Sequence, residues 1–131
     1  MKKIYLSEPI FDKNEIDSAI SSIKKLNLSQ GKNVLKFEED FAQFVGCKYG
    51  IATNSGSSAN LIALTALKEL YHLRDGDEVI IPASTFATVA MPIIQIGLVP
   101  VYVDINLRDL NICIDSIKKA ITKKTKVIMP V

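Results

Sequence analysis

The sequence has few of the residues on which metal sites, disulfide frameworks and nucleic-acid interfaces depend. It contains two cysteines, Cys47 and Cys113, one histidine, His72, and no tryptophan. Neither cysteine lies in a metal-ligand or Cys-x-x-Cys spacing, so we interpret both as small apolar residues in a reducing compartment. The net charge of +2 comes without a basic stripe interleaved with aromatic residues, which argues against a nucleic-acid partner.

Long apolar runs are also missing. The N-terminus carries basic residues but lacks the apolar core of a signal peptide, and no run is long enough to span a bilayer. We therefore expect a cytoplasmic protein without a membrane partner. The 131 residues, 48% hydrophobic and 23% charged, are typical of one globular domain or of a piece of a larger one.

The most informative stretch is Thr53-Asn54-Ser55-Gly56-Ser57-Ser58-Ala59-Asn60-Leu61. The apolar run 49–52 before it predicts a short buried strand, and the run 61–67 after it has the apolar spacing of a helix. Backbone N–H groups at such a helix start have no partner within the helix, and the helix dipole favours an anion there. The glycine permits close approach and the serine hydroxyls add donors. The stretch therefore indicates phosphate binding, with simple helix capping by serine as the alternative.

Two common phosphate-binding motifs do not match this stretch. No Gly-Lys-Ser or Gly-Lys-Thr follows at the Walker spacing, and a single glycine does not make the dinucleotide fingerprint. A generic nucleotide-binding Rossmann domain is disfavoured for the same reason.

The rest of the chain alternates between helical and strand patterns. Helices are predicted over about 12–26, capped by Asp12, and over about 33–45, closed by Gly46. Further elements are a strand at 78–82, a helix to Gly97 in which Pro92 predicts a kink or a late start, a strand at 98–104, a short helix at 114–121 and a strand at 126–130. We interpret the aromatic stripe of the second helix, Phe37, Phe41 and Phe44, as core packing.

This order predicts an α/β fold in which N-terminal helices are followed by alternating strand–helix units. Continuous apolar strands favour a parallel sheet covered on both faces, whose ligands lie beyond the carboxyl ends of the strands. The serine turn, the segment 84–88 and Asp104 all fall at such ends. Phe86 is then either an aromatic that stacks on a planar ligand or a core phenylalanine at a helix start.

Several segments, taken in order, resemble one enzyme family. They are Leu28-Ser29-Gln30-Gly31, the helix with Phe37-Glu38 and Phe41-Ala42, Val45-Gly46, Asn54-Ser55-Gly56-Ser57-Ser58-Ala59-Asn60-Leu61, Asp75-Gly76-Asp77-Glu78-Val79-Ile80, 82–86, Gly97-Leu98-Val99-Pro100-Val101-Tyr102-Val103-Asp104 and 125–131. Together they are similar to the DegT/DnrJ/EryC1/StrS family of pyridoxal-phosphate-dependent sugar aminotransferases, within the fold-type-I superfamily. The resemblance covers nearly the whole chain at the family's spacing.

The resemblance implies roles for particular residues. Gly56, Ser57 and Ser58 match the turn that holds the phosphate of pyridoxal 5′-phosphate or pyridoxamine 5′-phosphate, and Phe86 matches the aromatic that stacks on its ring. The loop residues Ser29, Gln30 and Gly31 match a substrate loop beside an active site that is completed across a homodimer. Asp104 matches a family aspartate to which we assign a structural role. The reaction implied is transfer of an amino group, with glutamate as expected donor, to a nucleotide-linked keto sugar in polysaccharide or amino-sugar biosynthesis.

The resemblance also marks one departure and one absence. Met91 stands where the family often has an asparagine. The family's catalytic aspartate and cofactor-binding lysine lie beyond Val131, so no catalytic residue is assigned. Residues 1–131 are expected to be the N-terminal segment and first part of an incomplete cofactor-binding large domain, inactive in transamination by itself.

Two alternatives follow from the same residues. The Ser-Gly-Ser-Ser-Ala-Asn-Leu variant also resembles a branch of nucleotide-sugar 3-dehydratases, which use pyridoxamine phosphate with an iron–sulfur cluster and have histidine in place of the lysine. Alternatively, the chain is a non-catalytic binding or assembly module. We expect no metal ligands among the 131 residues.

Overall fold

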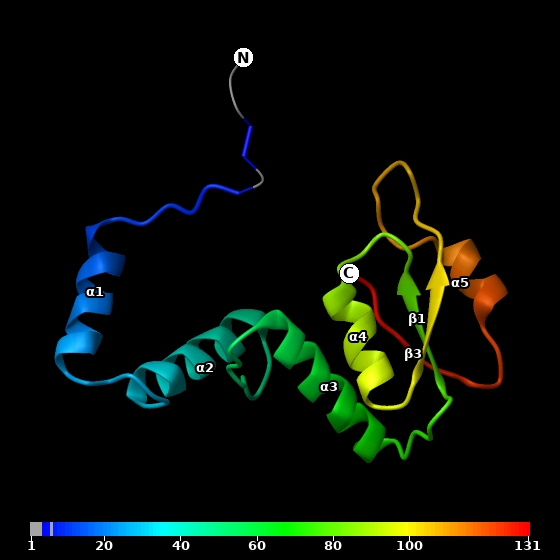
Figure 1. Ribbon diagram of the computed structural model, residues 1–131, viewed down its shortest axis with the longest axis horizontal. Helices are drawn as coiled ribbons and strands as arrows, with labels where there is room; N and C mark the ends of the chain where they lie inside the picture. Colours follow the sequence, from blue (N-terminus) through cyan, green and yellow to red (C-terminus); the bar gives the residue numbers. More distant parts are fainter. Residues whose placement is uncertain (1–3, 6) are drawn as a thin grey trace. The chain divides into compact units, whose positions relative to one another are not determined.

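The computed structural model describes residues 4, 5 and 7–131. These residues form two compact units, one up to Ala52, here called the N-terminal unit, and one from Thr53 to Val131, here called the sheet unit (Figure 1). In the described part of the chain, no helix combines the length and the apolar character needed to cross a membrane.

The N-terminal unit contains two helices, α1 (Lys13–Lys24) and α2 (Lys32–Val45). α1 begins at a capping box, in which the Asp12 carboxylate accepts the Asn14 N–H at 2.7 Å and the Glu15 carboxylate accepts the Asp12 N–H at 2.8 Å. α2 ends at Gly46, whose φ of 73° is the left-handed conformation that glycine adopts without strain. Both helices and both terminating residues agree with the sequence prediction.

The aromatic stripe of α2 does not pack into a core, so that interpretation was wrong. Phe37, Phe41 and Phe44 are 58%, 50% and 86% exposed. The rings lie against one another instead, with centroids 5.8 Å apart for Phe37–Phe41 and 6.4 Å apart for Phe41–Phe44. Within the N-terminal unit no described element packs over these rings, and Ala42 is its one buried residue among those described.

The predicted strand at 49–52 does not form. A strand requires a neighbour that accepts and donates backbone hydrogen bonds, and no described residue pairs with this run as a strand. The Ala52 N–H instead donates to the Glu38 carboxylate at 2.8 Å. Gly50 lies against the α2 backbone so closely that an added Cβ would be 2.6 Å from the Glu38 carbonyl oxygen.

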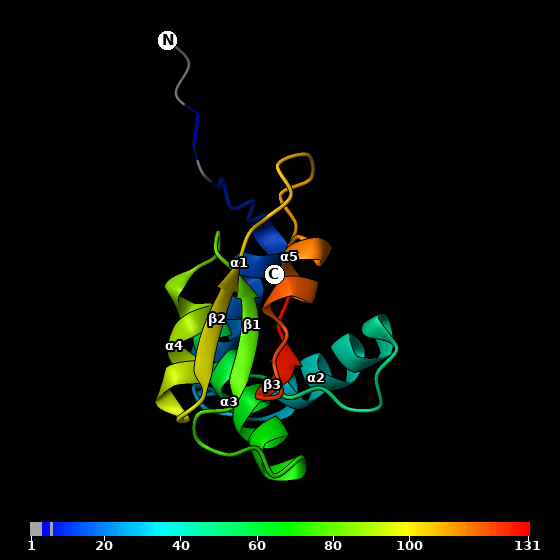
Figure 2. The same ribbon diagram turned by 90° about the vertical axis from the view of Figure 1, so that its right-hand side faces the viewer.

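The sheet unit alternates helices and strands. It consists of α3 (Gly56–Leu70), β1 (Glu78–Pro82), α4 (Ala87–Gln95), β2 (Val99–Val103), α5 (Ile114–Ala120) and β3 (Thr125–Ile128). The strands form a parallel sheet in the order β2-β1-β3, with Ile80 of β1 opposite Val101 and Ile128 (Figure 2). β1 is therefore the central strand of the sheet.

The core lies on both faces of β1. Val79 and Ile81 are fully buried in one cluster with residues of α3 and α4, including Leu64 and Ile93. Ile80 points to the other face because successive side chains alternate, and it is also fully buried. Figure 1 shows α4 and α5 on opposite sides of the sheet. The predicted α/β fold with a parallel, doubly covered sheet is confirmed for this strand.

α4 runs continuously through Pro92 and begins at Ala87, so the sequence-based alternative of a late start was wrong. The proline is buried, and Val89 and Ile93 pack beside it in the core. Tertiary burial of this apolar face compensates for the hydrogen bond that proline removes from a helix.

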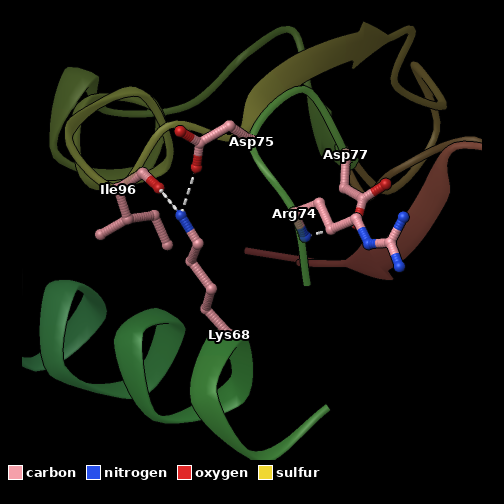
Figure 3. Close-up of polar contacts among 5 residues, drawn as sticks. All are labelled: Lys68, Arg74, Asp75, Asp77 and Ile96. Atoms are coloured by element: carbon pink, nitrogen blue, oxygen red, sulfur yellow. Dashed lines mark hydrogen bonds and ion pairs between the residues drawn. The ribbon is translucent and has the colours of Figure 1, made fainter. Parts of the chain in front are cut away.

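A polar latch joins α3 to the ends of α4 and β1 (Figure 3). The Lys68 ammonium donates to the Asp75 carboxylate and to the Ile96 carbonyl oxygen, each at 2.5 Å. Beside it, the Gly76 N–H donates to the Gly97 carbonyl at 2.9 Å. The latch fixes the turn before β1 against the turn between α4 and β2.

Candidate functional site

α3 begins at Gly56 rather than at Leu61, so the serine-rich stretch forms its first turn. Ser55 is the N-cap: its hydroxyl accepts the Ser58 N–H at 3.2 Å, and its carbonyl accepts the Ala59 N–H at 3.0 Å. The Thr53 hydroxyl donates to the same Ser55 carbonyl at 2.9 Å. Capping by serine is therefore observed, and it occurs at the residue before the predicted phosphate-binding group.

Capping by Ser55 leaves donors available at Gly56 and Ser57. These are the first two helical residues, whose N–H groups have no acceptor within the helix. A Cβ added to Gly56 would meet no atom within 4 Å, so the space beside its backbone is open. The start of α3 thus offers two N–H groups and the hydroxyls of Ser57 and Ser58 to an anion.

The first turn of α4 lies beside the first turn of α3. The Asn60 side-chain amide donates to the Thr88 carbonyl at 3.2 Å, and Lys68 reaches Ile96 near the other ends of the two helices. Both contacts join residues 28 positions apart, so the two helices run in the same direction. The positive ends of both helix dipoles therefore face the same region, which favours a negative ligand.

A cavity of about 300 Å³ opens between these helices, here called the α3–α4 groove. Its lining residues are Ser57, Ser58, Leu61, Ala87, Thr88, Met91, Pro92 and Gln95. None of them has an ionisable side chain. The groove can therefore bind an anion through neutral donors and helix dipoles, and it contains no general acid or base of its own.

Phe86, the residue directly before α4, is 76% exposed, so the alternative of a core phenylalanine is wrong. It lines a second cavity, of about 320 Å³, with Ser84, Thr85 and Val131. Phe86 directly precedes Ala87 of the α3–α4 groove, but it does not itself line that groove. The structure thus brings Ser57 and Ser58 together and leaves Phe86 in the neighbouring cavity.

The remaining predicted site residues lie elsewhere. Ser29, Gln30 and Gly31 form the loop between α1 and α2 and line a cavity of about 90 Å³ within the N-terminal unit. Asp104 follows β2, and its carboxylate accepts the Ile105 N–H at 2.8 Å, a local contact that agrees with a structural role. The described residues include no cluster of three or more His, Cys, Asp or Glu side chains able to hold a metal ion.

Sequence reasoning placed the segment 84–88 at a ligand-binding strand end but gave no role to its Thr85 or Thr88, and it missed Gln95. Thr88, Met91 and Gln95 lie on one face of α4 and line the groove. Their spacing of three to four residues is a sequence pattern from which this shared face could have been predicted. The Thr85 hydroxyl oxygen is buried without a hydrogen-bond partner in the described chain. No sequence pattern distinguishes Thr85 from a solvated threonine, because its burial comes from the tertiary structure.

Comparison with known proteins agrees with this geometry. The pattern described as the DegT/DnrJ/EryC1/StrS aminotransferase family matches residues 9–131. The chain belongs to this family.

Individual members of the family show how much of their length the chain represents. It is 38% identical over 137 aligned residues to a GDP-4-keto-6-deoxy-D-mannose 3-dehydratase of Yersinia pseudotuberculosis, covering 100% of this chain and 35% of that protein. The structure of the E. coli enzyme of the same name, with bound hydrated PLP, matches with a TM-score of 0.88 at 36% identity over 95% of this chain and 33% of that one.

An aminotransferase structure matches as well. It is described as a putative sugar aminotransferase from Streptococcus pneumoniae in its PMP form, with a TM-score of 0.83, 28% identity, and coverage of 98% of this chain and 32% of that one. The chain thus spans about a third of the length of the relatives it matches. The shared fold is that of fold-type-I enzymes, as the sequence predicts.

Proposed function

We propose that Gly56, Ser57 and Ser58 bind the phosphate of pyridoxal 5′-phosphate or pyridoxamine 5′-phosphate in a family enzyme that acts on a nucleotide-linked keto sugar. The observation that carries the proposal is the pairing of two helix N-termini at the α3–α4 groove, with N–H groups at the start of α3 left open by the Ser55 cap. Two parallel dipoles and neutral donors suit a phosphate dianion.

The residues of the sheet unit fit this cofactor. The open space beside Gly56 permits a phosphate to approach the backbone, and the exposed ring of Phe86 can lie against a pyridine ring. The Thr85 hydroxyl, buried without a hydrogen-bond partner in the described chain, belongs to a residue that lines the same cavity as Phe86. When bound, such a cofactor supplies an electron sink for carbanion chemistry, while this chain's residues hold its phosphate and orient its ring.

The reaction we propose first is amino transfer, with glutamate as donor, to the keto group of the sugar. A second candidate is 3-dehydration by pyridoxamine phosphate. A specific observation favours it: among the matching structures, the E. coli 3-dehydratase is 36% identical to this chain and the putative sugar aminotransferase 28%. The residue at the family's lysine position, beyond Val131, distinguishes the two, because lysine supports transamination and histidine supports dehydration.

The wider assignment rests on the family relationship. We propose a cytoplasmic homodimer in which Ser29, Gln30 and Gly31 border the sugar substrate near the subunit boundary. No described residue in the groove can transfer a proton, so residues 1–131 by themselves are expected to be inactive. A non-catalytic binding or assembly module remains the third candidate, and it predicts weak noncovalent cofactor binding.

The phosphate site is tested by substitution in the protein at its full natural length. Ser57→Leu places a bulky side chain beside the open N–H groups and should raise the dissociation constant for pyridoxal 5′-phosphate at least tenfold, measured by spectroscopic titration. Thr65→Val, on α3 away from the groove, is the matched control and should leave it unchanged. Phe86→Ala should shift the absorption band of bound cofactor. Unchanged affinity in Ser57→Leu together with an unchanged spectrum in Phe86→Ala would refute the site.

The reaction is tested with a nucleotide-linked 4-keto sugar. In the presence of glutamate and the cofactor, an amino sugar identified by mass spectrometry supports transamination, whereas loss of the C3 hydroxyl supports dehydration. Cofactor binding with neither product would favour the binding-module candidate.

A further inference from the structure

The carbonyl oxygen of Thr88 has lost its normal partner within α4. In an α-helix this oxygen accepts the N–H of the residue four positions later, and that residue is Pro92, which has no N–H. A carbonyl in this position requires a donor from outside its own helix or from water.

Asn60 supplies that donor. Its side-chain amide nitrogen lies 3.2 Å from the Thr88 carbonyl oxygen. Asn60 belongs to α3, one turn after Ser57. A proline in one helix and an asparagine in the next thus form a complementary pair, in which the first frees an acceptor and the second occupies it.

The α4 end of this contact borders the α3–α4 groove, since Thr88 and Pro92 line the groove. On α3 the groove is lined by Ser57, which lies one turn before Asn60. Because residues three and four apart are neighbours on a helix, movement of Asn60 relative to Thr88 changes the width of the groove where the phosphate donors lie. The Lys68–Ile96 contact holds the opposite ends of the two helices, away from the N–H groups of Gly56 and Ser57. Neither Lys68 nor Ile96 lines the groove, although Gln95, the residue before Ile96, does.

We infer that Asn60 is a positioning residue for phosphate binding, which fixes the first turn of α4 against the first turn of α3 through the carbonyl that Pro92 leaves free. The inference rests on the proposed function and adds a residue that does not itself contact the cofactor. Asn60 acts through the spacing of the two helix N-termini, and its contribution depends on Pro92.

The first test measures cofactor affinity in the protein at its full natural length. Asn60→Ala should raise the dissociation constant for pyridoxal 5′-phosphate about fivefold, the effect of losing one hydrogen bond. Lys68→Met is the matched control, because it removes the contact at the other end of the helices. It should lower the denaturation midpoint while leaving the dissociation constant within about twofold. If Asn60→Ala fails to fold, Asn60→Leu, which preserves the volume without the donor, takes its place.

The second test uses Pro92. In Pro92→Ala the backbone N–H at position 92 returns and can satisfy the Thr88 carbonyl. Asn60→Ala introduced into this background should therefore change the dissociation constant by less than twofold, and the coupling in the double-mutant cycle should account for most of the single-mutant effect.

The outcomes separate this inference from the proposed function. If Ser57→Leu weakens cofactor binding but Asn60→Ala does not, the phosphate site stands and the inference is overturned. Equal losses of affinity in Asn60→Ala and Lys68→Met would overturn it too, since general loosening would then explain both. If Ser57→Leu has no effect, the proposed site itself fails. An Asn60→Ala effect that is the same with proline or alanine at position 92 would remove the role given to Pro92.

Discussion

The ammonium nitrogen of Lys68 lies 2.5 Å from the carbonyl oxygen of Ile96, so a side chain from α3 closes the C-terminal end of α4. The Lys68 side chain is only 24% exposed, whereas Asp75, its other partner, is 81% exposed. The hydrogen bond from Lys68 to the Ile96 carbonyl should therefore contribute more to the stability of the fold than the ion pair with Asp75. A partly buried charged donor to a carbonyl stabilises a fold more than an ion pair screened by water.

Replacing Lys68 by methionine should destabilise the protein by about 1–2 kcal/mol, because the Ile96 carbonyl loses its charged donor. Asp75→Asn keeps an acceptor near Lys68 and should cost less than about 0.5 kcal/mol, since the ion pair is largely solvated. Urea denaturation monitored by circular dichroism measures both. Equal losses in the two variants would show that the ion pair, not the carbonyl, provides the stability of the latch.

Gly97 and Gly76 form a matched pair for testing close packing. Both have positive φ, 81° and 86°, so alanine at either position costs about 1–2 kcal/mol in backbone strain. Only at Gly97 would a Cβ also meet a neighbour, at 2.6 Å from the Asp75 carboxylate oxygen. Gly97→Ala should therefore lower the free energy of unfolding by up to about 0.5 kcal/mol more than Gly76→Ala, because the exposed Asp75 side chain can move aside at the small cost of its ion pair. Adding Asp75→Ser to Gly97→Ala should remove the excess, and no difference between the glycines would contradict the packing argument.

Ser55→Ala should destabilise the sheet unit by about 1 kcal/mol, because the Ser58 N–H loses the capping hydroxyl. Ser57→Ala removes a hydroxyl two residues further along that makes no cap contact, and the thermal midpoint of this variant should match that of the unchanged protein. The comparison separates the structural serine from the one assigned to ligand binding. A similar loss in both would mean that the whole stretch acts as a cap.

The N-terminal end of α1 should respond to pH. Interaction with the Glu15 side chain, followed by the hydrogen bond from the Asn14 N–H, holds the pKa of Asp12 below its usual value of 3.8. Since the folded pKa is lower than the unfolded one, the carboxylate stabilises the helix fully above about pH 4, and this stabilisation falls as pH decreases through the folded value. NMR signals of residues 13–16 should report fraying in acid. In Asp12→Asn the N-cap side chain no longer titrates, while the Glu15 carboxylate of the capping box remains. The same signals should therefore change less over that range.

Many elements of the fold could be predicted because their signals are local. Asp12 and Gly46 mark helix ends through contacts with residues a few positions away, and the apolar run 78–82 is long enough only for a buried strand. The serine stretch was also correctly placed at a helix start, although the helix begins at Gly56. The local rules failed at 49–52, where an apolar run lacks a strand to pair with.

The amino-acid sequence by itself was enough to identify the family and the α/β alternation and to predict Gly56, Ser57 and Ser58 as phosphate-binding residues, because each depends on the order and spacing of motifs along the chain. Only the tertiary structure decided that β1 lies between β2 and β3. It also decided that Asn60 satisfies the carbonyl of Thr88, that Lys68 reaches Ile96, and that Phe86 is exposed rather than buried. The two hydrogen bonds join residues 28 positions apart, and the exposure of Phe86 depends on which other residues cover it. Local sequence patterns do not report either, because hydrophobic burial brings residues together regardless of their distance in the sequence.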